Sequence, residues 1–471
     1  MTGRRKLLVV LGILGLFAVG VPVTLLIIWK DESPPDDSDL LPQRLAVSDA
    51  DNAYTFYRQA ARVLVWPCYK PEDEGEASSE EPAAAEDEEK QKAETEKRDL
   101  LDYIGCGKNW DAAAAADVLQ QNKETLALLE KGLACRECQF PEVKTIDDML
   151  KRDGTLGCLA LCRLWRVRVE VLAHEGKTAE AVDEALKVIR FGDHVEQSRG
   201  ILSTWLVGMT AKQMGMDSLR RIALASSLPP DRLLACARWL GECEHDSEGY
   251  ADALRAEYAM SWNMVEVGLM AKLDQVRKEH GFWGQVSPTG WLFKPNATKR
   301  CFVDIFRLKI ANAGRPYAEA VSGPASAYAP MTLKNHVKGN VTGQMIFRVL
   351  QPPVGALKIK CQAKTEAEVT RALLALKAFK LKTGRLPATL DELVPDYLPS
   401  VPLDDFSGKP IRYSAEKKIG YSLGQDLKDV GGFTKDEAQA WYERTESEDS
   451  RKDYPEPEQW KIPNPSWPID F

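Results

Sequence analysis

Residues 365–432 read TEAEVTRALLALKAFKLKTGRLPATLDELVPDYLPSVPLDDFSGKPIRYSAEKKIGYSLGQDLKDVGG, and this stretch decides how the C-terminal part of the chain folds. Thr365 and Glu368 have the capping-box spacing, in which a hydroxyl and a carboxylate satisfy the first free amides of a helix. We therefore expect a helix to begin at Thr365. Apolar residues then recur at steps of three and four and predict one buried face: Val369, Leu373, Leu376 and Phe379. Gly384 fits the left-handed residue that ends many helices.

Turn formers and short apolar runs predict a small β structure after this helix. Thr389 and Glu392 form a second capping box, which predicts a short helix. A strand, a charged hairpin tip, a return strand and a polar, glycine-containing loop follow in that order: residues 411–414, 416–418, 421–423 and 424–432. The predicted unit is thus a long helix accompanied by an antiparallel hairpin.

Three turn motifs occur in order: G-R-x-P-x-x-L-x-x-L at 384–393, D-x-F-x-G-K-P-x-x-Y at 404–413 and Y-S-L-G-x-D-x-K-x-x-G-G at 421–432. In this order they make the segment similar to the globular domain of the G-type major pseudopilin of type II secretion. The resemblance implies a small α+β domain over residues 363–445, in which one long helix lies on a short antiparallel sheet. It covers only this part of the 471-residue chain.

The resemblance also implies a calcium site in the last loop. The carboxylates that match the family's ligands are those of Asp426 and Asp429, and calcium binds several such oxygens together with loop carbonyls. The sequence departs from the family pattern at Leu427, where a glycine is usual, and at residues 433–434, where further acids are expected. A solvated turn without a metal is the alternative interpretation of this loop.

An uncharged apolar run at residues 7–29 predicts a membrane anchor over residues 1–30. At ~1.5 Å per residue, a helix of this length crosses the ~30 Å hydrocarbon core. Basic residues precede the run and acidic residues follow it. We therefore expect a single pass through a bacterial inner membrane, with the N-terminus in the cytoplasm and the body in the periplasm. A signal peptide cleaved after residues 18–20 is the alternative.

The position of this anchor differs from that in the pseudopilins. In that family the membrane segment, with a glutamate just after its cleavage point, runs directly into the amphipathic helix. Here the apolar run lies far upstream of residue 363 and contains no acidic residue. We therefore do not expect a filament subunit of the ordinary kind.

Two acidic stretches predict segments without a hydrophobic core. Residues 31–50 are rich in aspartate, serine and proline and predict a linker. Residues 71–97 hold twelve acidic residues, three lysines and no aromatic side chain, and predict a disordered insert. The whole chain has a net charge of -8, so the remainder is nearly neutral and nucleic-acid binding finds no support.

Helical periodicity predicts a mainly α body over residues 51–350. The amphipathic segments on either side of Gly176 resemble one tetratricopeptide-type hairpin. No second copy occurs, and a compact body is therefore expected instead of a repeat array. Residues 446–471 predict a loosely held tail, whose Trp460 and Trp467 either pack on the preceding domain or bind a partner.

Four of the ten cysteines occur in two close pairs, Cys135-x2-Cys138 and Cys158-x3-Cys162. Buried apolar thiols, disulfides of an exported body, a four-thiolate zinc site and a redox-active Cys135/Cys138 pair all fit this spacing. A thioredoxin-like pair would need its first cysteine at a helix start within a βαβ unit, whereas Cys135 follows a predicted helix.

Sequence motifs of catalysis are absent. The chain contains no H-E-x-x-H, G-x-S-x-G, G-x-x-x-x-G-K-[ST] or G-x-G-x-x-G pattern. We interpret His174 and His194, on predicted helix surfaces, as solvated or internally satisfied residues. The chain is therefore not expected to be an enzyme.

Three functions follow from these observations. The first is a membrane-anchored extracytoplasmic protein that binds other proteins or has a structural role. The second is an accessory component of a type II secretion or pilus-like assembly, which depends on fold-level analogy. The third is an enzyme or a thiol-redox protein that uses the Cys135/Cys138 pair.

Overall fold

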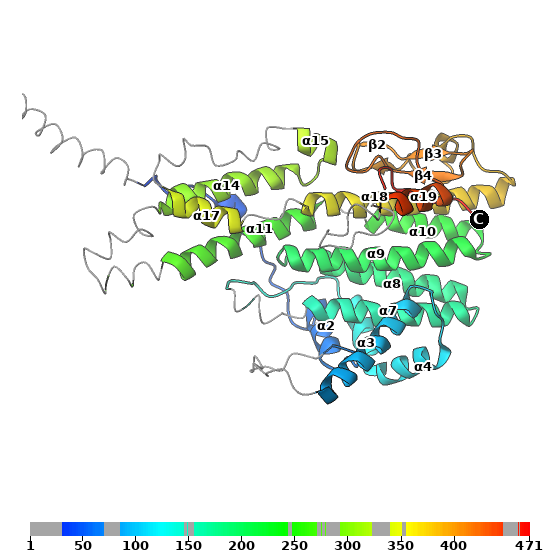
Figure 1. Cartoon of the computed structure of the whole chain (residues 1–471), viewed down its shortest axis with the longest axis horizontal. Coiled ribbons are helices and arrows are strands. Elements are labelled where there is room, and N and C mark those ends of the chain that lie inside the picture. Colours follow the sequence, from blue (N-terminus) through cyan, green and yellow to red (C-terminus); the bar gives the residue numbers. More distant parts are fainter. Residues whose placement is uncertain are drawn as a thin grey trace, which may run out of the picture.

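The computed structural model describes residues 31–69, 85–145, 148, 155–243, 247–270, 275, 278, 293–322, 340–350, 355–445, 460 and 462–471. In this part of the chain the fold is mainly helical with two small antiparallel sheets, as the mainly α prediction requires. Helices are stacked in layers from α2–α4 through α7, α8 and α9 to α18, and the sheets lie on the outer side of α18 (Figure 1).

The helical elements are, in chain order, η1 (Ser38–Leu40), α2 (Ala53–Arg62), α3 (Ala85–Gly105), α4 (Ala112–Gln121), α5 (Lys123–Ala134), α7 (Thr155–His174), α8 (Thr178–Glu196), α9 (Leu202–Ala225), α10 (Pro230–Cys243), α11 (Glu248–Asn263), the π-helical η2 (Met264–Met270), α14 (Pro295–Asn312), α15 (Tyr317–Ser322), α17 (Val341–Leu350), α18 (Ala356–Thr383), η4 (Leu390–Leu393) and α19 (Lys435–Thr445). The strands are β1 (Leu403–Asp404), β2 (Lys409–Pro410), β3 (Arg412–Ser414), β4 (Ile419–Tyr421) and β5 (Ser466–Pro468).

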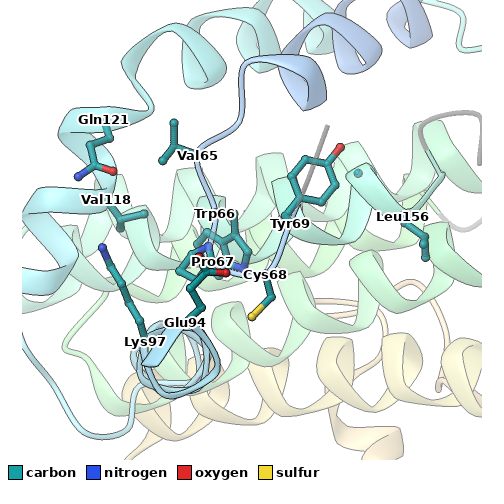
Figure 2. Close-up of a pocket in the computed structure, with 11 residues that line it drawn as sticks. Val65, Trp66, Pro67, Cys68, Tyr69, Glu94, Lys97, Val118, Gln121 and Leu156 are labelled. Carbon is teal, nitrogen blue, oxygen red and sulfur yellow. The ribbon is translucent and has the colours of Figure 1, made fainter. Parts of the chain in front are cut away.

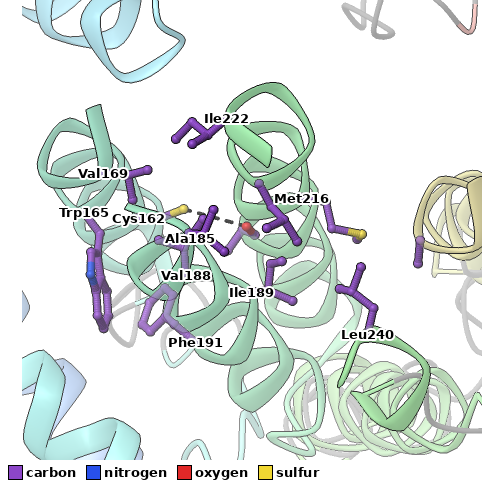
Figure 3. Packing of buried hydrophobic residues seen from close by; sticks show 14 of the residues in the cluster. Cys162, Trp165, Val169, Ala185, Val188, Ile189, Phe191, Met216, Ile222 and Leu240 are labelled. Carbon is purple, nitrogen blue, oxygen red and sulfur yellow. Dashed lines mark hydrogen bonds between the residues drawn. The ribbon is translucent and has the colours of Figure 1, made fainter. Parts of the chain in front are cut away.

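Helices α7, α8 and α9 form the centre of the molecule. The turn between α7 and α8 contains Gly176 in a left-handed conformation (φ 75°), so the predicted helical hairpin is present. Helices α8 and α9 approach so closely that a Cβ on Gly208 would lie 2.3 Å from the backbone nitrogen of Glu196. Apolar side chains such as Trp165 and Phe191 belong to the core around α7, α8 and α9 (Figure 3).

Helix α18 begins at Ala356, and the predicted start at Thr365 is wrong. Thr365 lies inside the helix, where its hydroxyl accepts a hydrogen bond from the Asp405 amide at 3.1 Å and so does not cap a helix start. The predicted end is confirmed, because Gly384 is left-handed (φ 78°) and its amide donates to the Lys380 carbonyl. A tertiary contact thus replaces the local cap that the sequence pattern suggested.

Helix α18 joins the predicted C-terminal domain to the helical body. One part of its surface contacts α9 and α10, and another contacts β1 and β4. The Lys377 ammonium donates to the carbonyls of Ala223, Leu224 and Ser226 and so satisfies the C-terminal end of α9. A single hydrophobic core extends from α2 to β5. The two predicted domains therefore share one core.

The predicted hairpin is present as β3 and β4, which pair antiparallel with Tyr413 opposite Gly420. The C-terminal tail adds β5 to the other edge of β4. Trp460 and Trp467 are buried, and the Trp460 indole donates to the Glu366 carboxylate at 2.6 Å. The prediction of a loosely held tail is therefore wrong for the part of the tail that the structure describes.

A second, smaller core lies where the N-terminal segment meets α11, α14 and α17. Residues 31–50, which we expected to be a linker, dock here through the buried Leu40. Asp37 accepts a hydrogen bond from the Tyr258 hydroxyl at 2.6 Å and forms an ion pair with Lys299 at 2.8 Å. Residues 31–40 are thus docked, because the acidic residues that suggested solvent exposure are paired on α11 and α14, whereas residues 41–50 are irregular and largely exposed.

The acidic insert predicted over residues 71–97 is helical from residue 85 onward, as the first part of α3. Alanine, glutamate and lysine dominate this part and all favour helix. The predicted anchor at residues 1–30 lies outside the described residues. Among the helices that are described, none combines the length and apolarity needed to cross a membrane.

Candidate functional site

A groove of about 660 Å³ lies between the segment after α2 and the helices α3, α4 and α7. We call it the α2–α4 groove; its walls include Val65, Trp66, Cys68, Lys97, Val118 and Leu156 (Figure 2). Val65 is 50% exposed and Leu156 is 44% exposed, although both are large apolar residues. The groove therefore presents apolar side chains to solvent on a concave surface.

The buried side chain of Asn122 fixes one wall of this groove. Asn122 lies at the junction of α4 and α5, and its amide nitrogen donates to the Val65 carbonyl at 2.8 Å. Its amide oxygen accepts a hydrogen bond from the Val65 backbone nitrogen, also at 2.8 Å. Because both backbone groups of Val65 are satisfied in this way, the segment is held extended with its side chain available for contact.

Trp66 and Cys68 add polar groups to the same wall. Trp66 is 4% exposed, and its indole nitrogen has no hydrogen-bond partner among the described residues. Buried donors without a partner are rare in folded proteins. Cys68 is exposed, has a left-handed backbone (φ 61°) and places its sulfur 3.8 Å from the Thr95 hydroxyl.

The structure separates the four clustered cysteines into two environments. Cys135, Cys138, Cys158 and Cys162 form no disulfides. Cys162 lies in the core between α7 and α9, where its thiol donates to the Ala211 carbonyl at 3.9 Å (Figure 3). Cys135, Cys138 and Cys158 instead lie near the hydroxyl of Tyr57, whose pKa is raised by burial and by these neighbouring thiols.

Burial raises the pKa of each of these four thiols above its ordinary value. The pKa rises to about 12 for Cys158 and Cys162, and it is also raised for Cys135 and Cys138. Because the thiolate is the redox nucleophile, these shifts disfavour redox chemistry at the four thiols. Of the interpretations that the spacing allowed, buried apolar thiols agree best with this environment.

The predicted calcium ligands offer few free oxygens. The Asp429 carboxylate accepts hydrogen bonds from the Tyr421 hydroxyl at 3.2 Å and the Gly431 amide at 3.0 Å, and it pairs with Arg412 at 3.3 Å. Asp426 is exposed on the same loop. In the described part of the chain, no group of three His, Cys, Asp or Glu residues could hold a metal ion. The two carboxylates alone do not make up the set of oxygens that calcium prefers, and calcium binding in this loop stays a prediction.

His194, which we interpreted as a surface residue, is buried on α8 with 8% exposure. Its Nδ1 lies 2.9 Å from the Tyr57 hydroxyl. The ring also lines a cleft of about 340 Å³ together with Cys138 and Trp239. Burial, with a smaller effect of Arg190, lowers the pKa of His194 to about 4. Sequence reasoning missed this residue because Tyr57, on α2, is distant from α8 along the chain.

This lowered pKa predicts a pH dependence of stability that His194→Gln should reduce. The unfolded chain binds a proton near the ordinary histidine pKa of about 6.5, whereas folded His194 does so only near pH 4. Stability is therefore lost as the pH falls from 6.5 to 4, and the loss from this group is roughly 3 kcal/mol. Urea unfolding as a function of pH measures this difference.

The matched control for this measurement is His174→Gln. His174 is exposed on α7 and stacks on Trp110, with ring centroids 3.8 Å apart. We expect the control to keep the full acid destabilisation of the wild type, while His194→Gln loses about half or more of it. Superimposable pH profiles for wild type and His194→Gln would show that the buried imidazole does not resist protonation.

Comparison with protein-family models, with curated proteins and with solved structures finds no match to this chain. The likeness to a pseudopilin domain therefore depends on the three turn motifs themselves.

Proposed function

We propose that the chain is a protein-binding protein, anchored in a bacterial inner membrane by residues 1–30, whose body lies in the periplasm and binds a partner in the α2–α4 groove. The observation that carries this proposal is the exposure of Val65 and Leu156 in a concave site. Exposed apolar side chains on a concave surface are typical of sites that bind other proteins.

The composition of the groove favours a polypeptide segment as its ligand. Val65 and Leu156 supply apolar contact, while Glu94 and Lys97 line the same groove and are exposed. An apolar centre with a charged rim is the usual arrangement of a protein–protein interface. The wall fixed by Asn122 is already ordered, so binding does not have to order this segment.

The groove proposal is tested by Val65→Glu/Leu156→Glu, which replaces the two exposed apolar side chains of the groove with carboxylates. Full-length protein is cross-linked in native membranes, extracted in mild detergent and analysed by mass spectrometry. We expect one polypeptide to be recovered in stoichiometric amount with the wild type and at least about tenfold less of it with the variant. The recovered protein is then purified and its affinity measured directly.

The control is Val267→Glu/Met345→Glu, which introduces the same charges at apolar residues that are 56% and 62% exposed outside the groove. This control should retain the partner. Equal loss of the partner from both double variants would rule out the α2–α4 groove as the binding site. An affinity for the purified partner that the groove substitutions do not change would also rule it out.

A second candidate function is an accessory role in a type II secretion or pilus-like assembly. The observation that favours it is that the side chain of Asp404 connects two of the pseudopilin-like motifs by hydrogen bonds. Its carboxylate accepts hydrogen bonds from Phe406 in its own motif and from the Ser422 hydroxyl and the Leu423 amide in the next motif, beside α18. Recovery of pseudopilins cross-linked to β3 or β4, unaffected by the groove variant, would support this candidate over the first.

A further inference from the structure

A second concave surface lies at the C-terminal end of α18, where four lysines surround a cavity of about 400 Å³. They come from separate elements: Lys380 from α18, Lys417 and Lys418 from the turn between β3 and β4, and Lys435 from the start of α19. Asp470 is the one acidic side chain in this lining. We call this surface the lysine pocket.

Two of the four ammonium groups in the lysine pocket are already engaged. Lys417 forms an ion pair with Glu437 at 3.0 Å, and Lys380 donates to the Phe471 carbonyl. Lys418 and Lys435 are exposed and have no ion-pair partner in the part of the chain that the structure describes. The pocket therefore retains two cations that a ligand can neutralise.

The backbone places Lys418 at the pocket edge. Its carbonyl accepts a hydrogen bond from the Ile469 amide at 2.8 Å, and its backbone is left-handed (φ 51°) at the hairpin turn. Leu386 and Phe471 are half-buried apolar residues that line the same cavity. The pocket thus combines an apolar floor with a cationic rim.

We propose that the lysine pocket binds an acidic segment of a partner polypeptide, whose carboxylates pair with Lys418 and Lys435 while an adjacent apolar side chain lies on Leu386 and Phe471. An inorganic anion would use the rim but not the floor. The pocket also lies at the C-terminal end of α18, far from α14, whose first residues bind Asp31 (Figure 1). This position favours a polypeptide over the headgroups of the anchoring membrane.

The test measures binding of a fluorescein-labelled acetyl-Glu-Glu-Leu-Glu-Glu-amide peptide to the full chain in detergent by fluorescence anisotropy. We expect Lys418→Glu/Lys435→Glu to raise the Kd about tenfold or more at low ionic strength. The control Lys123→Glu/Lys131→Glu makes the same charge change at exposed lysines of α5 and should leave the Kd within about twofold. Added salt should weaken wild-type binding.

Equal Kd values for the two double variants would overturn the proposal. A peptide with glycine in place of leucine should bind more weakly than the leucine peptide. Equal Kd values for the two peptides would show that the apolar floor does not contribute to binding. Inorganic phosphate is the second probe, and competition at the same concentration as the peptide would make this an anion site. If the double variant does not fold, the single variant Lys435→Gln is measured in its place, and we expect its Kd for the peptide to rise about threefold.

Discussion

Asp404→Ala is expected to lower the free energy of unfolding by about 4 kcal/mol, because it removes a buried acceptor from several donors at once. Asp404 is 1% exposed. One carboxylate oxygen accepts hydrogen bonds from the Ser422 hydroxyl at 2.7 Å and the Phe406 amide at 3.1 Å. The other accepts from the Leu423 amide at 3.1 Å and the Ser407 hydroxyl at 3.0 Å.

The loss of stability in Asp404→Ala comes from the buried hydrogen-bond donors that lose their acceptor. Backbone amides and hydroxyls that lose an acceptor in a buried site cost about 1–3 kcal/mol each, unless water replaces the acceptor. Asp404→Asn should cost about half as much as the alanine variant, since it keeps one oxygen but turns an NH₂ group toward two donors. The network joins the turn of β1 and β2 to the strand β4, so the loss should affect the whole sheet region.

Urea unfolding followed by circular dichroism measures the Asp404 effect, and Asp396→Ala is the control. Asp396 is an exposed aspartate in the same region, between η4 and β1. Its removal should change the free energy of unfolding by less than about 0.5 kcal/mol. If Asp404→Ala and Asp396→Ala had similar stabilities, water would be satisfying the buried donors and the network would not be a major source of stability.

The same network shows what sequence patterns could and could not predict in this chain. Features that depend on neighbouring residues were predictable: the helix end at Gly384, the turn at Gly176 and the β3–β4 hairpin. The capping box at Thr365 was misleading because the threonine hydroxyl bonds to the 404–405 turn instead of to the start of its own helix. A capping pattern involves only neighbouring residues, but whether it marks the start of a helix depends on which other segments pack against those residues.

The candidate sites depended on contacts that no local pattern contains. His194 is buried by Tyr57 of α2, and β5 joins β4 from the far end of the chain. One wall of the α2–α4 groove is held by Asn122, at the junction of α4 and α5, which hydrogen-bonds to the backbone of Val65 after α2. The acidic composition of residues 31–50 indicated solvent exposure, yet basic residues of α14 pair with Asp37 and with its neighbours. Burial and charge pairing of this kind require the tertiary structure.

Gly208→Ala is expected to destabilise the protein by about 3 kcal/mol or more, although alanine is the better helix former by ~1 kcal/mol. Gly208 lies on α9 where that helix crosses α8. A Cβ at this position would lie 2.3 Å from the backbone nitrogen of Glu196 and 2.7 Å from its Cα. Since these are backbone atoms, no side-chain rotation relieves the contact and the two helices must separate.

Gly105→Ala is the matched control, because Gly105 is also a buried helical glycine but has room for a side chain. A Cβ added to Gly105 would lie 3.4 Å from its nearest neighbour, the Arg166 Cβ. The control should be neutral or stabilising by up to ~1 kcal/mol, as helix propensity predicts. Urea unfolding of both variants therefore gives opposite signs if the α8–α9 contact is as close as the structure has it. Stabilisation by both would mean that α8 and α9 can move apart at little cost, and the core around Trp165 and Phe191 would then tolerate a looser arrangement of its central helices.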